Sequence, residues 1–148
     1  MESQSKQVVI VGASAAGLRC ACRLRRLQPE WSITVVEAGE VFSYGACGLP
    51  YVLSGDIDEL GALRRTPYGA DRDEDYFAGV KNVEVLSPWR ATSVDVEAKT
   101  VRIEGADGQR DLEWDELVIA TGASPRRLPD QPEHPRVHTF HVWDDVKP

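Results

Sequence analysis

The chain has 148 residues, a formal net charge of −7 and 42% hydrophobic side chains. This length accommodates one domain of ordinary size, and no window approaches the roughly 20 consecutive apolar residues of a membrane-spanning helix. The acidic balance argues against a protein that binds along nucleic-acid phosphates, because such binding requires a basic surface. We therefore expect neither a membrane nor a nucleic acid among the partners.

The N-terminal residues and the cysteines indicate the cellular compartment. The first residues run directly into an apolar strand pattern, without the apolar stretch and cleavage site of a secretory signal, which predicts a cytoplasmic location. The three cysteines, Cys20, Cys22 and Cys47, are too few and too closely placed for a disulfide framework or a four-ligand zinc site. We expect no metal site and at least one free thiol.

The first 37 residues have the pattern of a strand, a helix and a second strand. Gln7–Val11 is rich in β-branched residues and ends at Gly12, and Ala15–Leu27 has a helical pattern. Trp31–Val36 then alternates as a second strand that ends at Glu37. This unit predicts parallel strands with a right-handed crossover.

The middle of the chain is harder to interpret. Ala38–Gly48 is expected to be a glycine-rich loop, followed by a short helix over Cys47–Ser54. Asp56–Gly79 mixes charges, glycine and proline, and only Asp73–Phe77 has a weak helical pattern. The sequence therefore predicts little about the residues that follow the short helix.

From residue 83 onward the chain returns to strand patterns. Val83–Leu86 predicts a strand, and three short alternating runs predict an antiparallel meander: Ala91–Val96, Thr100–Ile103 and Arg110–Trp114. Glu116–Ala120 has the continuous apolar pattern of a strand that is buried on both faces of a parallel sheet. Pro125–Pro135 contains four prolines and predicts an extended connection.

The turn between the first strand and the helix, Gly12–Gly17, has the sequence GASAAG. A dinucleotide-binding turn needs a first glycine for its backbone, a small middle residue beside the pyrophosphate and a small last residue for helix packing. Here Ser14 stands at the middle position. Glu37 follows Gly17 by 20 residues, where a carboxylate can bind an adenosine ribose and repel a 2′-phosphate. The turn favours FAD or NAD over NADP; the alternative is that its glycines serve packing alone.

Cys47 lies in the run Ser43–Tyr51, which reads SYGACGLPY. A cysteine at the start of a short helix has its thiolate stabilised by unpaired N–H groups, so that the pKa falls and the sulfur becomes a nucleophile. The alternative is a buried structural cysteine. That alternative fits Cys20 and Cys22 better, because they point to different faces of one helix and cannot readily pair.

Four features, in this order and spacing, resemble the N-terminal part of the pyridine nucleotide-disulfide oxidoreductases. They are the Gly12–Gly17 turn, Glu37, the Ser43–Tyr51 run and the run LVIATGASP at Leu117–Pro125. The resemblance is to the single-cysteine branch, which contains coenzyme A-disulfide reductases, NADH oxidases and persulfide reductases. It implies an α/β, Rossmann-like FAD/NAD(P)-binding domain with a parallel sheet and a three-stranded antiparallel meander. An incomplete FAD-binding domain would occupy residues 1–124, and residues 125–148 would extend toward an NADH-binding domain.

The resemblance also implies a role for each cofactor-binding residue. Glu37 would bind the adenosine ribose, and the backbone at Ala91 would border the adenine. The FAD pyrophosphate would lie along five residues of the turn: Gly12, Ser14, Ala15, Ala16 and Gly17. The chain would pass beneath the cofactor at Ala120, Thr121 and Gly122. The catalytic Cys47 would lie against the isoalloxazine ring. NADH would reduce FAD, and the flavin would then reduce an oxidised Cys47, which is either a mixed disulfide with a small thiol or a sulfenic acid.

A basic stripe on the first helix bears on the substrate. Arg19, Arg23 and Arg26 are spaced by four and three residues and share one face, which is either solvated or ligand-binding. In the resembling family coenzyme A lies along this helix, so these three arginines and Ser43 would bind the substrate. Arg19 and Arg23 replace polar residues of the family, and Ala46 replaces a common asparagine. The resemblance therefore implies coenzyme A or another anionic thiol, disulfide or polysulfide as the substrate.

The length limits what the chain can do alone. A whole enzyme of the family has a second nucleotide-binding domain, a return segment and a C-terminal dimerisation domain. We therefore expect part of a homodimeric enzyme, or a polypeptide cut short, that is inactive by itself. Two other hypotheses stay open: a non-catalytic nucleotide-binding module, and a Rossmann-like enzyme of unrelated chemistry in which Cys47 serves packing.

Overall fold

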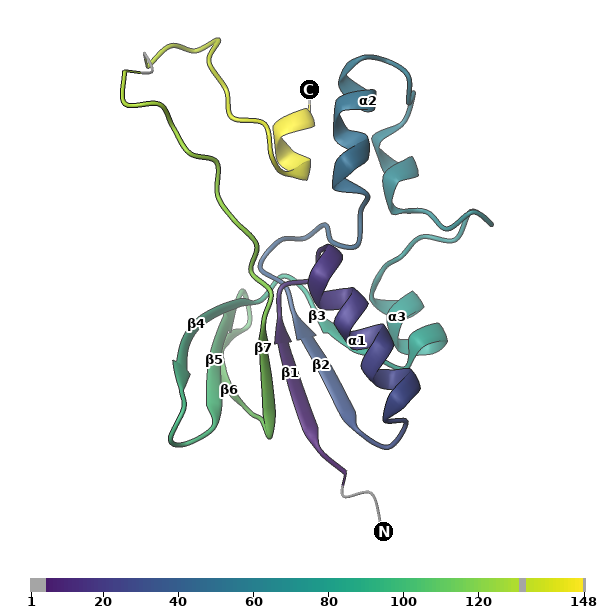
Figure 1. Cartoon of the computed structure of the whole chain (residues 1–148), viewed down its shortest axis with the longest axis vertical. Coiled ribbons are helices and arrows are strands. Elements are labelled where there is room, and N and C mark those ends of the chain that lie inside the picture. The colour runs from purple at the N-terminus through teal and green to yellow at the C-terminus, as the bar shows by residue number, and fades with distance from the viewer. Residues whose placement is uncertain (1–4, 131–132, 148) are drawn as a thin grey trace.

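The computed structural model describes residues 5–130 and 133–147 (Figure 1). A four-stranded parallel sheet has the order β3-β2-β1-β7, and a three-stranded antiparallel sheet has the order β4-β5-β6. The strands are β1 Gln7–Val11, β2 Ser32–Val36, β3 Glu84–Leu86, β4 Arg90–Asp95, β5 Thr100–Gly105, β6 Gly108–Glu113 and β7 Glu116–Ile119. This arrangement confirms the predicted Rossmann-like α/β class and the meander.

Helices occupy one face of the parallel sheet and the region beyond its carboxyl edge. The helices are α1 Ala15–Leu27, α2 Leu49–Leu53 and α3 Glu74–Lys81, with 3₁₀ helices η1 Ala46–Gly48, η2 Leu60–Arg64 and η3 Trp143–Val146. In Figure 1, α2 stands beyond the carboxyl ends of β1 and β2, and η3 lies beside it. Among the described residues, none of the helices has the length and apolar character that crossing a bilayer requires.

Strand β1 is buried on both faces, because successive side chains of a strand point in opposite directions. Ile10 packs in the cluster that contains Leu18 of α1 and Phe77 of α3. Val9 packs in a second cluster with Ile103 of the antiparallel sheet. The continuous β-branched run of β1 therefore follows from its position between a helical layer and a second sheet.

The last strand of the parallel sheet differs from the prediction. Glu116–Ala120 was expected to be buried on both faces, but β7 pairs with β1 alone and forms an edge of the sheet. Leu117 and Val118 are half-buried, and Ile119 is 60% exposed. Its apolar composition is therefore greater than its burial within the described chain explains.

Two helical predictions were also inexact at their boundaries. The expected helix over Cys47–Ser54 divides into the 3₁₀ turn η1 and the short α2, so Cys47 precedes the α-helix instead of opening it. The weak pattern at Asp73–Phe77 marks a longer helix, α3. Its start is fixed by Asp73, whose carboxylate accepts the N–H of Tyr76 at 2.9 Å.

The chain after β7 carries no helix or strand through residue 130, which agrees with the expected extended connection. Within the predicted connection at Pro125–Pro135, residues 131–132 lie outside the described residues. So do residues 1–4 of the predicted FAD-binding domain and residue 148 of the predicted connection. The described chain ends just after η3, close to α2.

Candidate functional site

The glycine turn is shaped by close backbone contacts. Gly12 has a φ of 108°, and a Cβ atom there would fall on the carbonyl oxygen of Ala120. A Cβ atom on Gly17 would fall on the carbonyl oxygen of Gly12. Both positions therefore require glycine, which leaves the turn with a bare backbone at the start of α1.

The start of α1 offers hydrogen-bond donors to an anion. Ser14 is the N-cap residue, and its side chain makes no capping bond. The N–H groups of the first helical turn have no carbonyl partner within the helix, and the helix dipole adds positive potential there. The bare turn and these donors fit the pyrophosphate of a dinucleotide.

Glu37 stands at the mouth of the turn, at the end of β2. Its carboxylate oxygens accept the N–H of Ala13 at 2.8 Å and the N–H of Gly39 at 2.9 Å. A carboxylate can accept about four hydrogen bonds, so two ribose hydroxyls can still bind. Glu37 therefore holds the glycine turn, a role that the sequence did not indicate.

A cleft of about 370 Å³ runs past this turn. Seven of the predicted cofactor-binding residues line it: Gly12, Ser14, Glu37, Ala91, Ala120, Thr121 and Gly122. Sequence reasoning missed other lining residues, among them Trp89, Arg90 and His141. His141 lies about 50 residues along the chain from Ala91, and no local pattern could have indicated that the two share a cleft.

The other three predicted cofactor-binding residues lie away from the cleft lining. Ala15 lines a neighbouring groove instead. Ala16 is exposed and lines neither space, and Gly17 is buried in the contact between α1 and β1. Within residues 5–130 and 133–147, no group of three or more His, Cys, Asp or Glu side chains is arranged to hold a metal ion.

Cys47 is exposed and lines neither the cleft nor this groove, although the residues just before it line both. Its neighbour Ala46 lines the cleft, whereas Gly45 lines the groove. Cys20 and Cys22 are half-buried on α1, less buried than the structural alternative predicted, and Cys22 also lines the groove.

The groove has a volume of about 500 Å³ and a basic wall. Three of the four predicted substrate-binding residues, Arg19, Arg26 and Ser43, line it, whereas Arg23 is exposed outside it. Arg72 and Lys81 also line it, and both lie in or just after the stretch whose sequence predicted least. None of the described residues that line the groove is an aspartate or a glutamate. An acidic chain therefore carries a groove that attracts anions.

Tyr44 joins the cleft, the groove and the C-terminal segment. It lines both spaces, and its hydroxyl oxygen accepts the backbone N–H of Trp143 at 3.2 Å. The two rings meet edge to face with centroids 5.3 Å apart. The adjoining turn is fixed by Asp145, whose pKa is lowered because its carboxylate accepts the N–H groups of Val142 and His141.

Comparisons with known proteins agree with this geometry. The chain is 38% identical over 121 residues to the NAD(P)H sulfur oxidoreductase (CoA-dependent) of Pyrococcus abyssi, a match that covers 82% of this chain and 25% of that relative. It is 30% identical over 125 residues to a coenzyme A disulfide reductase of Staphylococcus aureus, covering 82% of this chain and 27% of that relative. The structure of an NAD-dependent persulfide reductase from A. fulgidus superimposes with a TM-score of 0.90 at 45% identity, over 95% of this chain and 26% of that chain.

The chain thus spans about a quarter of the length of the curated relatives it matches. Residues 6–148 match the sequence profile of one family, described as pyridine nucleotide-disulphide oxidoreductase. That match covers nearly the whole chain and confirms the resemblance seen in the sequence. The chain belongs to the pyridine nucleotide-disulphide oxidoreductase family.

Proposed function

We propose that this chain is the FAD-binding part of an NADH-dependent flavoprotein oxidoreductase that reduces a disulfide, a persulfide or oxygen through Cys47. The observation that carries the proposal is that Cys47 lies on an exposed loop whose preceding residues, Gly45 and Ala46, line the basic groove and the cleft. A sulfur there can face a cofactor on one side and a substrate on the other. The FAD-binding domain would occupy residues 1–124.

The residues of the cleft fit FAD at its adenosine end. Glu37 would accept the ribose hydroxyls, the start of α1 would bind the pyrophosphate, and Ala91 would border the adenine. The cleft continues to Ala46, next to the cysteine, which is where the flavin ring would lie. When bound, FAD would supply two-electron transfer between NADH and sulfur.

The groove supports an anionic thiol or disulfide as the substrate. Four cationic side chains, from Arg19, Arg26, Arg72 and Lys81, line it. None of the four makes an ion pair within the described part of the chain. Phosphate groups bind readily to such a set, so coenzyme A, which is named in two of the relatives, is the leading candidate.

The cofactor half of the proposal is tested by titrating the chain with FAD. We expect Glu37→Ala to weaken FAD binding by about 10- to 100-fold, because a charged acceptor of two hydroxyl groups is lost. Glu97→Ala, in the exposed turn between β4 and β5, is the matched control and should leave the affinity unchanged. Equal affinity in the Glu37 variant, or no FAD binding by the unaltered chain, would contradict the proposal.

The role of Cys47 is tested by a single turnover that does not need NADH. Cys47 is first converted to a mixed disulfide with thionitrobenzoate, and the FAD-bound chain is then reduced chemically without oxygen. Two electrons from the reduced flavin should break the S–S bond and release one thionitrobenzoate thiolate, leaving the Cys47 thiolate, while two protons pass to solvent. The matched control is a variant in which Cys20 and Cys47 are replaced by serine, so that only Cys22 carries thionitrobenzoate. Thionitrobenzoate release from this variant should be much slower than release from Cys47. Equal release rates from Cys47 and Cys22 would show that Cys47 has no special role in electron transfer from the flavin.

A further inference from the structure

The loop that carries Cys47 is held from outside by one residue of η2, Leu63. The N–H of Gly45 donates to the Leu63 carbonyl oxygen at 2.9 Å. The Leu63 side chain covers Gly48, where an added Cβ atom would collide with a Leu63 methyl group. Leu63 therefore contacts the loop on both sides of Cys47, once through its backbone and once through its side chain.

Arg72 fixes Leu63 in turn. Its Nη2 donates to the same Leu63 carbonyl oxygen at 2.9 Å, and its Nε donates to the carbonyl oxygen of Arg64 at 3.0 Å. The backbone N–H of Arg72 also donates to the Arg64 carbonyl oxygen, at 3.1 Å. These carbonyls lie at the end of η2, where no helical partner is available, and one guanidinium spans them.

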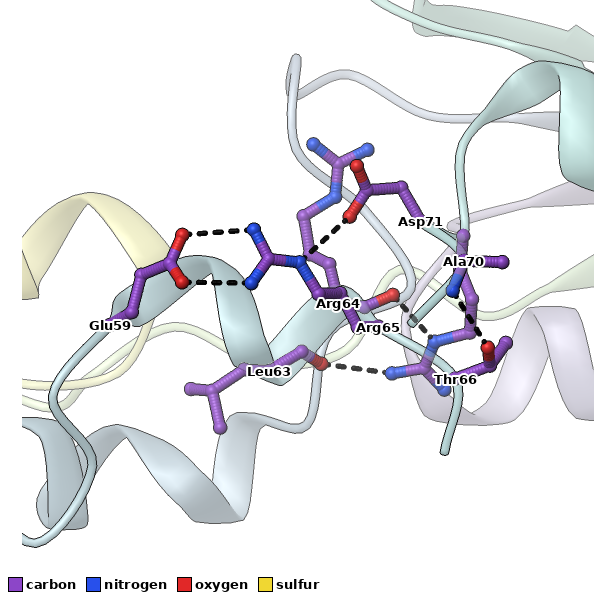
Figure 2. A network of polar contacts seen from close by, with 8 residues as sticks. Glu59, Leu63, Arg64, Arg65, Thr66, Ala70 and Asp71 are labelled. Carbon is purple, nitrogen blue, oxygen red and sulfur yellow. Dashed lines mark hydrogen bonds and ion pairs between the residues drawn. The ribbon is translucent and has the colours of Figure 1, made fainter. Parts of the chain in front are cut away.

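The same guanidinium lines the basic groove. Two of its five N–H groups are used in the bonds to Leu63 and Arg64, and no described carboxylate pairs with it. The neighbouring Arg65 differs, because its guanidinium bonds both Glu59 oxygens at 2.8 and 2.9 Å and lies outside the groove lining (Figure 2). Arg72 thus combines an available charge with a connection to the cysteine loop through the Leu63 carbonyl oxygen.

We propose that Arg72 is a positioning residue that serves Cys47 in two ways. Through the Leu63 carbonyl it holds the Gly45–Gly48 loop in place, and through its charge it draws an anionic disulfide or thiol toward the sulfur. The inference rests on the proposed function, because it takes the groove as the substrate site. The first action depends on the planar shape of the guanidinium and the second on its charge. Substitutions that change the shape or the charge can therefore separate the two actions.

Two measurements on the 148-residue chain report the two actions. Hydrogen exchange of the Gly45 amide, read by NMR, reports the bond to Leu63. The second measurement is the ratio of two reaction rates at Cys47, one with anionic 5,5′-dithiobis(2-nitrobenzoate) and one with neutral 2,2′-dithiodipyridine, resolved by peptide mass spectrometry. In both reactions the Cys47 thiolate attacks one sulfur, and the other half leaves as a thiolate.

The lysine and glutamine variants separate geometry from charge. Arg72→Lys keeps the charge but replaces the planar fork of two nitrogens with a single ammonium nitrogen, so Gly45 exchange should rise about fivefold while the rate ratio stays the same. Arg72→Gln should raise exchange and also lower the rate ratio about threefold at low salt. Arg19→Gln, a groove control without contact to the loop, should lower only the ratio.

Arg65→Lys is the control for general stability of the segment, and it should change neither measurement. Unchanged Gly45 exchange in Arg72→Lys would overturn the proposal, as would an equal rise in Arg65→Lys. An unchanged rate ratio in Arg72→Gln would overturn its electrostatic half. FAD titration of the same variants is independent of these readouts, so failure to bind FAD would refute the proposed function and leave the Arg72 result standing.

Discussion

The glycine turn and the cysteine loop both lie beyond the carboxyl ends of parallel strands (Figure 1), but they are held in different ways. The turn is held by backbone packing, because Gly12 and Gly17 leave no room for a side chain. In the loop, Gly45, Ala46 and Cys47 are all exposed and are fixed by a few contacts from distant segments. The proposed cofactor end is therefore set by close backbone packing that only glycine permits, whereas the proposed substrate end depends on a few hydrogen bonds and side-chain contacts.

The largest effect should come from a methyl group in the turn. Gly12→Ala places a Cβ atom on the Ala120 carbonyl oxygen and forces an unfavourable φ, so the free energy of unfolding should fall by about 3 kcal/mol or more. Urea denaturation measures this change. The matched control is Gly79→Ala in α3, where an added Cβ atom meets nothing within 4 Å and helix propensity should stabilise by up to about 1 kcal/mol. A Gly12 variant as stable as the Gly79 variant would contradict the packing described for the turn.

The same substitution in the cysteine loop should cost less. An alanine at Gly48 meets the Leu63 side chain, which can rotate, instead of a backbone oxygen. We expect Gly48→Ala to lower the free energy of unfolding by about 1 kcal/mol, with the shifts in amide NMR signals confined to η1, α2 and η2. A loss as large as that of Gly12→Ala would mean that the loop is as rigidly packed as the turn.

Cysteine reactivity should follow the same contrast. Cys47 is exposed, whereas Cys20 and Cys22 are half-buried on α1, so alkylation at neutral pH should reach Cys47 at least about tenfold faster. Iodoacetamide labelling with peptide mass spectrometry resolves the three sites. Unfolding the chain in urea supplies the control, since it removes differences in access. Equal rates at the three cysteines of the folded chain would remove the case for a reactive thiol.

The smallest effect concerns the contact between Tyr44 and the C-terminal segment. The N–H groups of Val142 and His141 lower the pKa of Asp145 in the folded chain, so this stabilisation is present above the ordinary aspartate pKa of about 3.9 and is lost as the pH falls below it. NMR signals of η3 should therefore shift between about pH 4 and pH 2, before those of β1. Asp145→Asn should abolish that early change. If the η3 and β1 signals are lost at the same pH, η3 does not detach from Tyr44 before the sheet unfolds, which would contradict this prediction.

Periodicity and turn chemistry predicted much of the fold. The strand–helix–strand unit and the meander follow from local patterns, and the turn with Glu37 indicated the cleft because its residues are close in sequence or have a fixed spacing. Arg72 and Lys81 could not be predicted, since the segment that carries Arg72 is shaped by bonds to Leu63 and Arg64 and has no clear periodicity. The partial exposure of β7 also escaped prediction, because composition does not show which strand lies at an edge.

The central claim is that one cleft binds an adenine dinucleotide whose flavin end reaches Cys47. Amide NMR spectra of the chain with ADP and with FAD test it most directly, because the two ligands share only the adenosine diphosphate end. ADP should shift Gly12, Glu37 and Ala91, and FAD should shift these and also Ala46 and Cys47. Identical shifts with both ligands, or FAD shifts that spare the cysteine loop, would contradict the account.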